Sequence, residues 1–213
     1  MRSLHDYMIA EAVKKLPENV TGLIVCDIDD TLLVADTNKI GIYKNKPGEP
    51  EKYLSTDEFA KDPDAETHIE WFSFREFRDH QKVYQSIVSG TPVIKNLKIV
   101  DAYVNAGYDF CFLTARGCEE TVKRAIGDFM EIRKPNGALE KLGNEYRKAI
   151  SHAVNDDDKK YPGNSDAERK GKILRDLCDK YDRVVFVDDD RKNVEQAKAL
   201  GIKNLTVITA WGK

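Results

Sequence analysis

The feature that most constrains the fold is a short apolar run, Leu23 to Cys26, that ends directly in a group of acidic residues. The run is uncharged and rich in branched side chains, which is typical of a strand buried on both faces of a sheet. Asp27, Asp29 and Asp30 follow it, so we expect them at the carboxyl end of that strand, where open parallel sheets bind their ligands. Carboxylates packed this closely repel one another, and a cation or a proton has to compensate. The alternative is a solvated acidic turn.

Apolar strand patterns alternate with helical patterns along most of the remaining chain. Further strands are expected at residues 108–113, 183–187 and 205–208, and helices at residues 4–16, 92–106, 121–130, 167–181 and 193–200. Residues 138–150 have a helical pattern, whereas residues 149–154 alternatively contain a short strand. This alternation predicts an α/β protein of Rossmann-like type, with a parallel sheet and helices on both of its faces.

Residues 34–91 interrupt the alternation with dense charge and several glycine and proline residues. Because a structureless loop of this length is unusual in a compact domain, we interpret it as a small cap inserted into a core domain formed by residues 1–33 and 92–213.

Within the insertion, aromatic side chains between residues 71 and 84 are interleaved with Arg75, Arg78 and His80. Helical spacing predicts that Phe74, Phe77 and Arg78 share one face. Most of these aromatic residues are expected to form the core of the cap itself, with one aromatic ring and one arginine reaching the cleft beside the acidic residues.

Composition excludes several classes of protein. A net charge of −3 argues against a strongly basic nucleic-acid-binding surface, and no glycine-rich nucleotide-binding loop occurs. The apolar stretches are shorter than the roughly 20 residues that a bilayer requires, and the N-terminus lacks the apolar region of a signal peptide. We therefore expect a cytoplasmic protein. The spacing of the four cysteines favours buried thiols over disulfides or zinc ligands.

Four motifs occur in a fixed order along the chain, each at an expected strand end or helix start. They are Asp27-Ile-Asp-Asp-Thr31, Thr114 after Phe112-Leu113, a lysine at 170 or 172, and Asp188-Asp189 followed by Asn193. Their identity and order resemble those of the haloacid dehalogenase (HAD) superfamily of phosphoryl-transfer enzymes. The resemblance covers residues 20–32 and 92–210 and does not extend to the insertion.

The resemblance assigns a role to each motif. It implies that Asp27 is the nucleophile that forms an aspartyl-phosphate, and that Asp29 is the general acid and base. Thr114 holds a phosphate oxygen, while Arg116 either contacts the phosphate or leaving group or has no task. Lys170 neutralises the phosphoryl group, with Lys172 as the second choice.

The resemblance also implies a Mg²⁺ ion, since a dication with oxygen ligands brings the anionic nucleophile and the phosphate together. Its expected ligands are Asp27, the backbone carbonyl of Asp29 and an aspartate of the last motif. Asp189 fits best because Asn193 follows it by four residues, and Asp188 is the alternative.

The motif forms are most similar to those in the phosphatase part of bacteriophage-type polynucleotide kinase-phosphatases. The expected substrate is therefore a phosphorylated small molecule, such as a nucleotide, or a nucleic-acid terminal phosphate, contacted by Arg75 and Arg78. No membrane or stable protein partner is expected. Alternatives are a phosphatase of another metabolite and a non-catalytic binding protein with the HAD fold. A response-regulator receiver domain is not expected, because only 23 residues follow Asp190 in this sequence.

Overall fold

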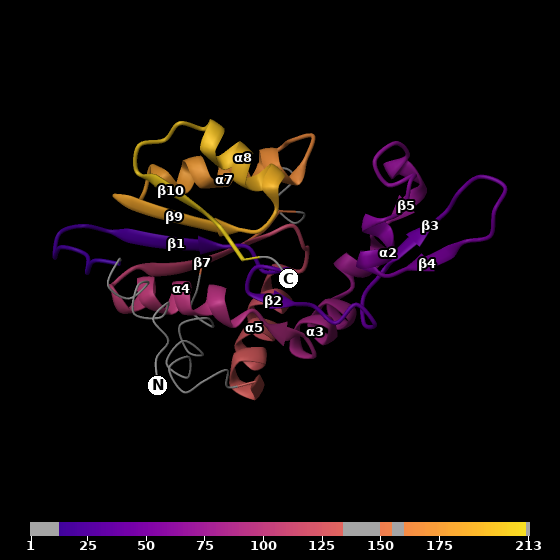
Figure 1. The fold of residues 1–213 in the computed structure, drawn as a ribbon, viewed down its shortest axis with the longest axis horizontal. Coiled ribbons are helices and arrows are strands. Elements are labelled where there is room, and N and C mark those ends of the chain that lie inside the picture. Colours follow the sequence, from indigo (N-terminus) through magenta and orange to yellow (C-terminus); the bar gives the residue numbers. More distant parts are fainter. Residues whose placement is uncertain (1–12, 134–149, 155–159, 212–213) are drawn as a thin grey trace.

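The computed structural model describes residues 13–133, 150–154 and 160–211. At its centre is a five-stranded sheet in the order β10-β9-β1-β7-β8 (Figure 1), and all neighbouring strands are parallel. The strands are β1 (Gly22–Cys26), β7 (Asp109–Thr114), β8 (Ile150–Ala153), β9 (Arg183–Asp188) and β10 (Leu205–Thr209). This confirms the predicted parallel sheet. Residues 150–153, for which the sequence left a helix and a short strand open, form a strand. Most of residues 4–16 and 138–149, where helices were predicted, lie outside the described residues.

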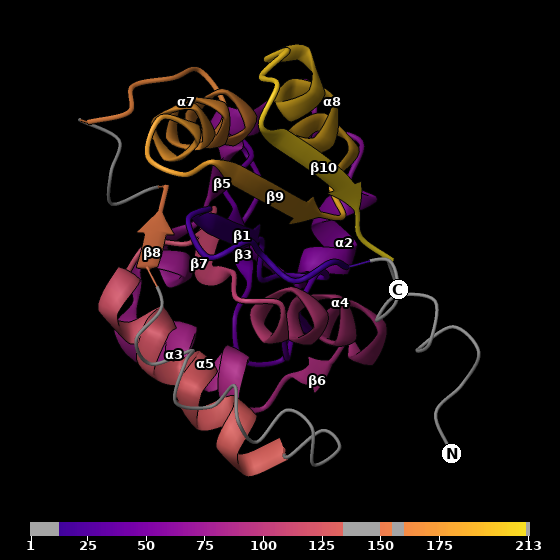
Figure 2. The same cartoon turned by 90° about the vertical axis from the view of Figure 1, so that its left-hand side faces the viewer.

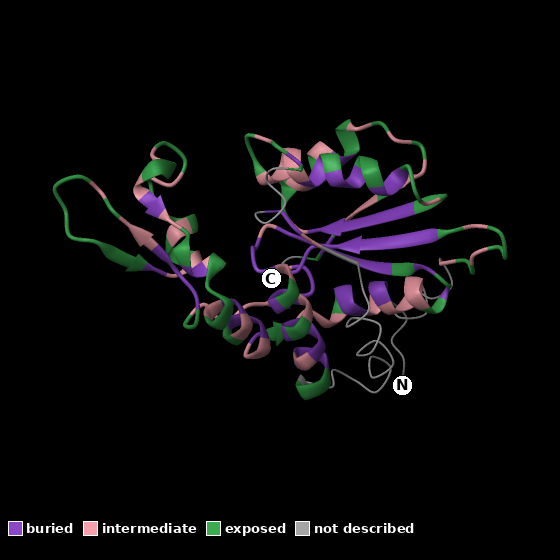
Figure 3. Cartoon of the chain, turned by 180° about the vertical axis from the view of Figure 1, so that it is seen from behind, coloured by how far each residue is buried: buried purple, intermediate pink, exposed green. Residues whose placement is uncertain are grey.

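Helices cover both faces of the sheet (Figure 2). One face carries α4 (Ile94–Asn105) and α5 (Glu119–Arg133), and the other carries α7 (Asp166–Cys178) and α8 (Arg191–Ala199). Successive strand residues point to opposite faces, so Ile24 and Phe112 pack with the first helix pair, whereas Val25 and Leu113 pack with the second. Figure 3 shows the central strands β9, β1 and β7 and the inner helix faces as largely buried. The architecture is compatible with a Rossmann-like fold.

The insertion begins and ends at a pair of short antiparallel strands, β2 (Leu33–Val34) and β6 (Thr91–Pro92). Between them, β3 (Ile42–Lys44), β4 (Lys52–Leu54) and β5 (Phe72–Ser73) form a separate sheet, accompanied by α2 (Thr56–Ala60). This small sheet projects to one side of the core (Figure 1). Its buried residues are Ile42, Leu54 and Phe72, which form a hydrophobic cluster of their own.

The aromatic segment of the insertion is not one helix, so the helical spacing predicted for it is wrong. The rings of Phe74 and Phe77 nevertheless lie together, with their centroids 6.1 Å apart. The chain forms a 3-10 turn at Ile69–Trp71, strand β5, a second 3-10 turn at Arg75–Arg78 and then α3 (His80–Val88). The physical reason is that β5 pairs with β3, and that Asp79 caps the start of α3 by accepting two backbone hydrogen bonds.

Helix α3 joins the insertion to the core. Its buried residues Val83 and Ile87 belong to the same hydrophobic cluster as the inner faces of α4 and α5. Among the described residues, no helix is long and apolar enough to cross a bilayer. The four cysteines are free and buried, as the sequence predicts.

A buried carboxylate, that of Glu76, holds the insertion together. It accepts hydrogen bonds from the backbone N–H of Gly41 at 2.9 Å and from the hydroxyls of Tyr43 and Tyr53 at 3.0 and 3.3 Å. The ammonium group of Lys82, on α3, lies 3.5 Å from the same carboxylate. Glu76 therefore links β3, β4 and α3.

Replacing Glu76 by Ala removes a buried acceptor shared by three donors, and we expect the insertion to lose about 1–3 kcal/mol of stability. Hydrogen exchange should accelerate in residues 41–54 and remain slow in β1 and β9. The exposed Glu66→Ala variant is the matched control and should exchange like the parent. Unchanged protection in Glu76→Ala would contradict the structural role of this carboxylate.

Candidate functional site

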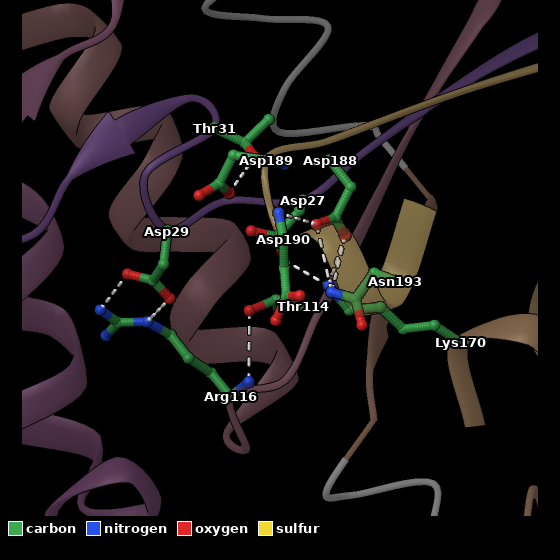
Figure 4. A network of polar contacts seen from close by, with 10 residues as sticks. All are labelled: Asp27, Asp29, Thr31, Thr114, Arg116, Lys170, Asp188, Asp189, Asp190 and Asn193. Carbon is green, nitrogen blue, oxygen red and sulfur yellow. Dashed lines mark hydrogen bonds and ion pairs between the residues drawn. The ribbon is translucent and has the colours of Figure 1, made fainter. Parts of the chain in front are cut away.

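The candidate site lies at the carboxyl ends of three adjacent strands of the central sheet (Figure 4). Asp27 directly follows β1, Thr114 ends β7 and Asp188 ends β9. Because β7 and β9 flank β1 in parallel, their carboxyl ends meet at one edge of the sheet. Residues from distant parts of the sequence are thus brought together.

The turn after β1 carries Asp29 and Thr31. Asp30 has a positive φ of 56°, which an aspartate adopts more readily than most residues, and its N–H donates to the carbonyl of Leu33 at 2.8 Å. The N–H of Leu32 donates to the carbonyl of Ile28 at 2.9 Å. These bonds fix a tight turn from which Asp29 contacts Arg116 and Thr31 contacts Asp189.

Lys170 is the central cation of the site. It lies on α7, and its Nζ donates to Oδ1 of Asp27 at 2.7 Å and to Oδ2 of Asp188 at 2.9 Å. Only 2% of the residue is exposed, so these ion pairs form away from bulk water. Lys172 is exposed, and its ammonium group donates to the backbone carbonyl of Pro162. Of the two lysines that the sequence left open, the structure places Lys170 at the site.

Asp188 orients the polar groups around it. Besides Lys170, its carboxylate accepts bonds from the side-chain amide of Asn193 at 3.0 and 3.1 Å and from the backbone N–H of Asp190 at 2.9 Å. Asp190 itself is exposed and caps α8 through a bond from the N–H of Lys192. Asn193, at the end of the last motif, therefore contacts Asp188.

Three carboxylates form a group that can hold a metal ion. Asp27, Asp188 and Asp189 each offer an oxygen, and these atoms lie within 4.8 Å of one another. Asp189 is held by Thr31, whose hydroxyl donates to its Oδ1 at 2.8 Å. Three carboxylates against one ammonium group leave the cluster negative, and an all-oxygen donor set suits a hard dication. The group can therefore hold a metal ion.

The ionisation of these groups reflects their burial. Burial raises the pKa of Asp27 well above its usual value; Lys170 lowers it, while Asp188 and Asp29 raise it further. Burial raises the pKa of Asp189, and the negative charges of Asp188 and Asp30 add to this effect. The hydrogen bond from Thr31 lowers the same pKa but does not outweigh the rise. Burial alone lowers the pKa of Lys170, but the attraction of its two aspartates outweighs it, so its pKa is raised. Lys170 is therefore charged at neutral pH.

Arg116 is buried and forms an ion pair with Asp29, so it is not an exposed arginine without a contact in the site. Its Nε and Nη2 donate to the two carboxylate oxygens of Asp29, both at 2.7 Å, and its Nη1 donates to Oγ of Ser86 at 2.8 Å. The arginine side chain is 2% exposed, whereas that of Asp29 is 40% exposed. Arg116 thus fixes the direction of Asp29 while leaving that carboxylate accessible from outside.

Thr114 is buried at the end of β7, and its hydroxyl accepts a hydrogen bond from the N–H of Arg116 at 3.2 Å. The hydroxyl hydrogen can still be donated to an anion. Helix α5 begins only at Glu119, so Thr114 is not its capping residue.

The other predicted substrate contacts lie apart from this group. Arg75 is exposed, stacks 3.5 Å from the ring centroid of Tyr43 and pairs with Glu51 at 2.8 Å. Arg78 is also exposed, and its carbonyl accepts a bond from the thiol of Cys118. None of these contacts among the described residues involves Asp27, Asp188 or Asp189.

A cavity of about 190 Å³ lies between the site and the insertion. Asp29 and Arg116 line it from the core, and Phe77 lines it from the insertion. Of the aromatic residues in the insertion, Phe72 is buried in the small cluster and Trp71 packs against it. Phe77 is thus the ring that reaches the cavity.

The sequence analysis did not identify Asn96 and Ser86, two completely buried residues that hold groups of the site in place. The amide of Asn96 donates to the carbonyls of Thr31 at 2.7 Å and Trp211 at 3.0 Å, so it supports the turn that holds Asp189. Ser86 accepts a bond from Arg116. The sequence signal that could have identified them is a polar residue among the apolar residues of one helix face. Asn96 shares its face with Val100, and Ser86 lies between Val83 and Ile87.

A comparison of the chain with protein-family models and with curated proteins returned no match. The likeness to the HAD superfamily therefore rests on the four motifs.

We expect Mg²⁺ to stabilise the protein more at higher pH, because protons compete with the metal for carboxylates whose pKa values are raised. The Mg²⁺-induced rise in Tm should therefore increase between about pH 5 and about pH 7.5. A tenfold gain in affinity corresponds to about 1.4 kcal/mol, or about 3–5 °C for a domain of this size. Thermal melts with Mg²⁺ or with a chelator measure the effect.

The control for this experiment is Asp189→Asn, which removes one carboxylate and should show a small Mg²⁺ effect at both pH values. An equal Mg²⁺ effect at both pH values in the parent protein would contradict metal binding by Asp27 and Asp189.

Proposed function

We propose that the protein is a Mg²⁺-dependent phosphomonoester hydrolase of the HAD type that acts through an aspartyl-phosphate on Asp27. The observation that carries the proposal is the contact of buried Lys170 with both Asp27 and Asp188, beside the carboxylate group that can hold a metal. In this proposal, Asp27 is the nucleophile, Lys170 is a fixed cation in contact with it, and Asp27, Asp188 and Asp189 are the metal-binding group. A nucleophile and strong charge neutralisation both accelerate the hydrolysis of a phosphomonoester, whose barrier in water is very high.

In the first step, a carboxylate oxygen of Asp27 attacks phosphorus while the bond from phosphorus to the leaving oxygen breaks. Asp29 lies two residues further along the turn and is accessible from the cavity, where it can donate a proton to the leaving oxygen. Arg116 holds Asp29 by two parallel hydrogen bonds and so fixes the direction of its carboxylate. These bonds favour the ionised form, so Asp29 has to take up a proton from water in the cavity before it can donate one to the leaving oxygen.

In the second step, Asp29 takes a proton from a water molecule, and the water oxygen attacks the phosphorus of the aspartyl-phosphate. The bond from phosphorus to Asp27 breaks, so phosphate leaves and Asp27 is restored. Throughout, Lys170 offsets the negative charge of Asp27 and of the phosphoryl group, and the Thr114 hydroxyl donates to a phosphoryl oxygen. Asp27 and Asp189, with Asp188 as a further oxygen donor, would hold a metal ion that would supply additional charge neutralisation.

The motifs support a nucleotide or a nucleic-acid terminal phosphate as the substrate class within this proposal. The insertion at residues 34–91 acts as the cap, because it supplies the cavity wall opposite Asp29.

The Asp27→Asn variant should lose turnover by at least about a thousandfold while remaining folded, because an amide is nearly isosteric but cannot attack phosphorus. Hydrolysis of p-nitrophenyl phosphate with Mg²⁺ and with a chelator measures the loss. The exposed Asp179→Asn variant is the matched control and should keep the parent rate. Turnover of Asp27→Asn at the parent rate would refute the proposed function, and Mg²⁺ binding without turnover in the parent would favour a non-catalytic binding protein.

Replacing Lys170 by Met keeps the length of the side chain and removes its charge, and we expect kcat to fall about 100- to 1000-fold. Lys172→Met, two residues away and exposed, should stay within about twofold of the parent. Steady-state kinetics of both variants, with circular dichroism to verify folding, make the comparison. Equal losses in the two variants would argue against a role for Lys170 in the reaction.

A further inference from the structure

The cavity of about 190 Å³ beside Asp29 has two kinds of wall. The core contributes Asp29, Asp30 and Arg116, and the insertion contributes Phe77 together with the hydroxyl residues Thr37 and Thr56. Asp29 is the proposed proton donor to the leaving group. A group bound in this cavity therefore lies next to the atom that the proposed reaction releases.

Phe77 is a fixed part of the wall. It packs against both the main hydrophobic cluster of the core and the small cluster of the insertion. Its ring centroid lies 5.9 Å from Cζ of Arg116, within the range of a cation–π contact. Because two hydrophobic clusters and a buried guanidinium surround this ring, it offers a preformed apolar surface to a ligand.

Carboxylates outnumber cations among the described side chains that line the cavity. Among the residues that the structure describes, Arg116 is the one cation that lines it, and its Nε, Nη1 and Nη2 all donate to Asp29 or Ser86. The carboxylates of Asp29 and Asp30 outnumber this single guanidinium. Neither Arg75 nor Arg78 lines the cavity, so neither balances its charge.

We propose that this cavity binds the leaving group and selects phosphomonoesters whose leaving group is uncharged and about the size of one ring. The inference rests on the proposed function and narrows its substrate class to a nucleotide or another small phosphomonoester, because the leaving group of a nucleic-acid terminal phosphate is itself anionic. A cavity of about 150 Å³ is known to hold benzene, so about 190 Å³ suits a single ring or sugar. A second anionic group in this space is repelled by the carboxylates, whereas Phe77 and the two hydroxyls accommodate a neutral one.

Two aryl phosphates of equal shape test the charge selection: 4-(carbamoylmethyl)phenyl phosphate and 4-(carboxymethyl)phenyl phosphate. They differ by an amide against a carboxylate, and the methylene group keeps the acidity of the two phenols similar. We expect kcat/KM to be roughly tenfold lower for the carboxylate, and the difference to shrink as salt screens the repulsion.

The Asp30→Asn variant removes one negative charge from the wall and retains a side chain suited to a positive φ. The ratio of kcat/KM for the carboxylate over the amide should rise by several fold in this variant. It should not change in Asp179→Asn, which removes an exposed carboxylate at the end of α7. A ratio insensitive to Asp30 would overturn the assigned charge selection.

A further variant, Phe77→Leu, tests the apolar wall. Relative to the parent, it should lower kcat/KM for phenyl phosphate several fold more than for methyl phosphate, whose leaving group does not reach the ring. Comparing the two substrates within one variant cancels any general loss of folded enzyme. Equal effects on both substrates would show that Phe77 serves packing alone and overturn its part in recognition.

The outcomes separate the inference from the proposed function. Turnover of both aryl phosphates with equal kcat/KM overturns the inference and leaves the phosphatase assignment intact. Absence of turnover with every phosphomonoester overturns the assignment and, with it, the inference.

Discussion

The candidate site depends on one buried ammonium group, the Nζ of Lys170. Without it, Asp27 and Asp188 would face each other in a nearly water-free space, which costs several kcal/mol per unpaired charge. With it, both carboxylates are fixed at 2.7 and 2.9 Å from the same nitrogen, and Asn193 completes the shell of Asp188. A single cation does not neutralise three carboxylates, however, and this remaining negative charge is what favours a metal ion beside Asp27 and Asp189.

A second buried cation, Arg116, connects the site to the insertion. It holds Asp29 through two hydrogen bonds, contacts Ser86 on α3 through a third, and lies near the ring of Phe77. The direction of Asp29 is therefore tied to the position of α3, which packs in the main core. In the proposed function, the same contacts that place the proton donor also shape the space for the leaving group.

Sequence and structure agree where a property is encoded locally. The strands at residues 22–26, 109–114, 183–188 and 205–209 occur where short apolar runs predict them. They disagree at residues 69–88, where the aromatic and charged pattern fits one helix but the chain forms two 3-10 turns, a strand and a helix. There, the backbone of Phe72 and Ser73 pairs with β3, a contact that no local pattern reveals.

The sequence by itself determined the α/β class, the parallel sheet and the placement of Asp27, Thr114 and Asp188 at strand ends. The physical reason is that an apolar run fixes a buried strand, and parallel strands bring their carboxyl ends to one edge. Only the tertiary structure decided that Lys170 rather than Lys172 meets Asp27, 143 positions away, and that Arg116 binds Asp29, 87 positions away. Such pairings depend on how helices and turns rotate as they pack, which is a property of the assembled core and not of the local sequence.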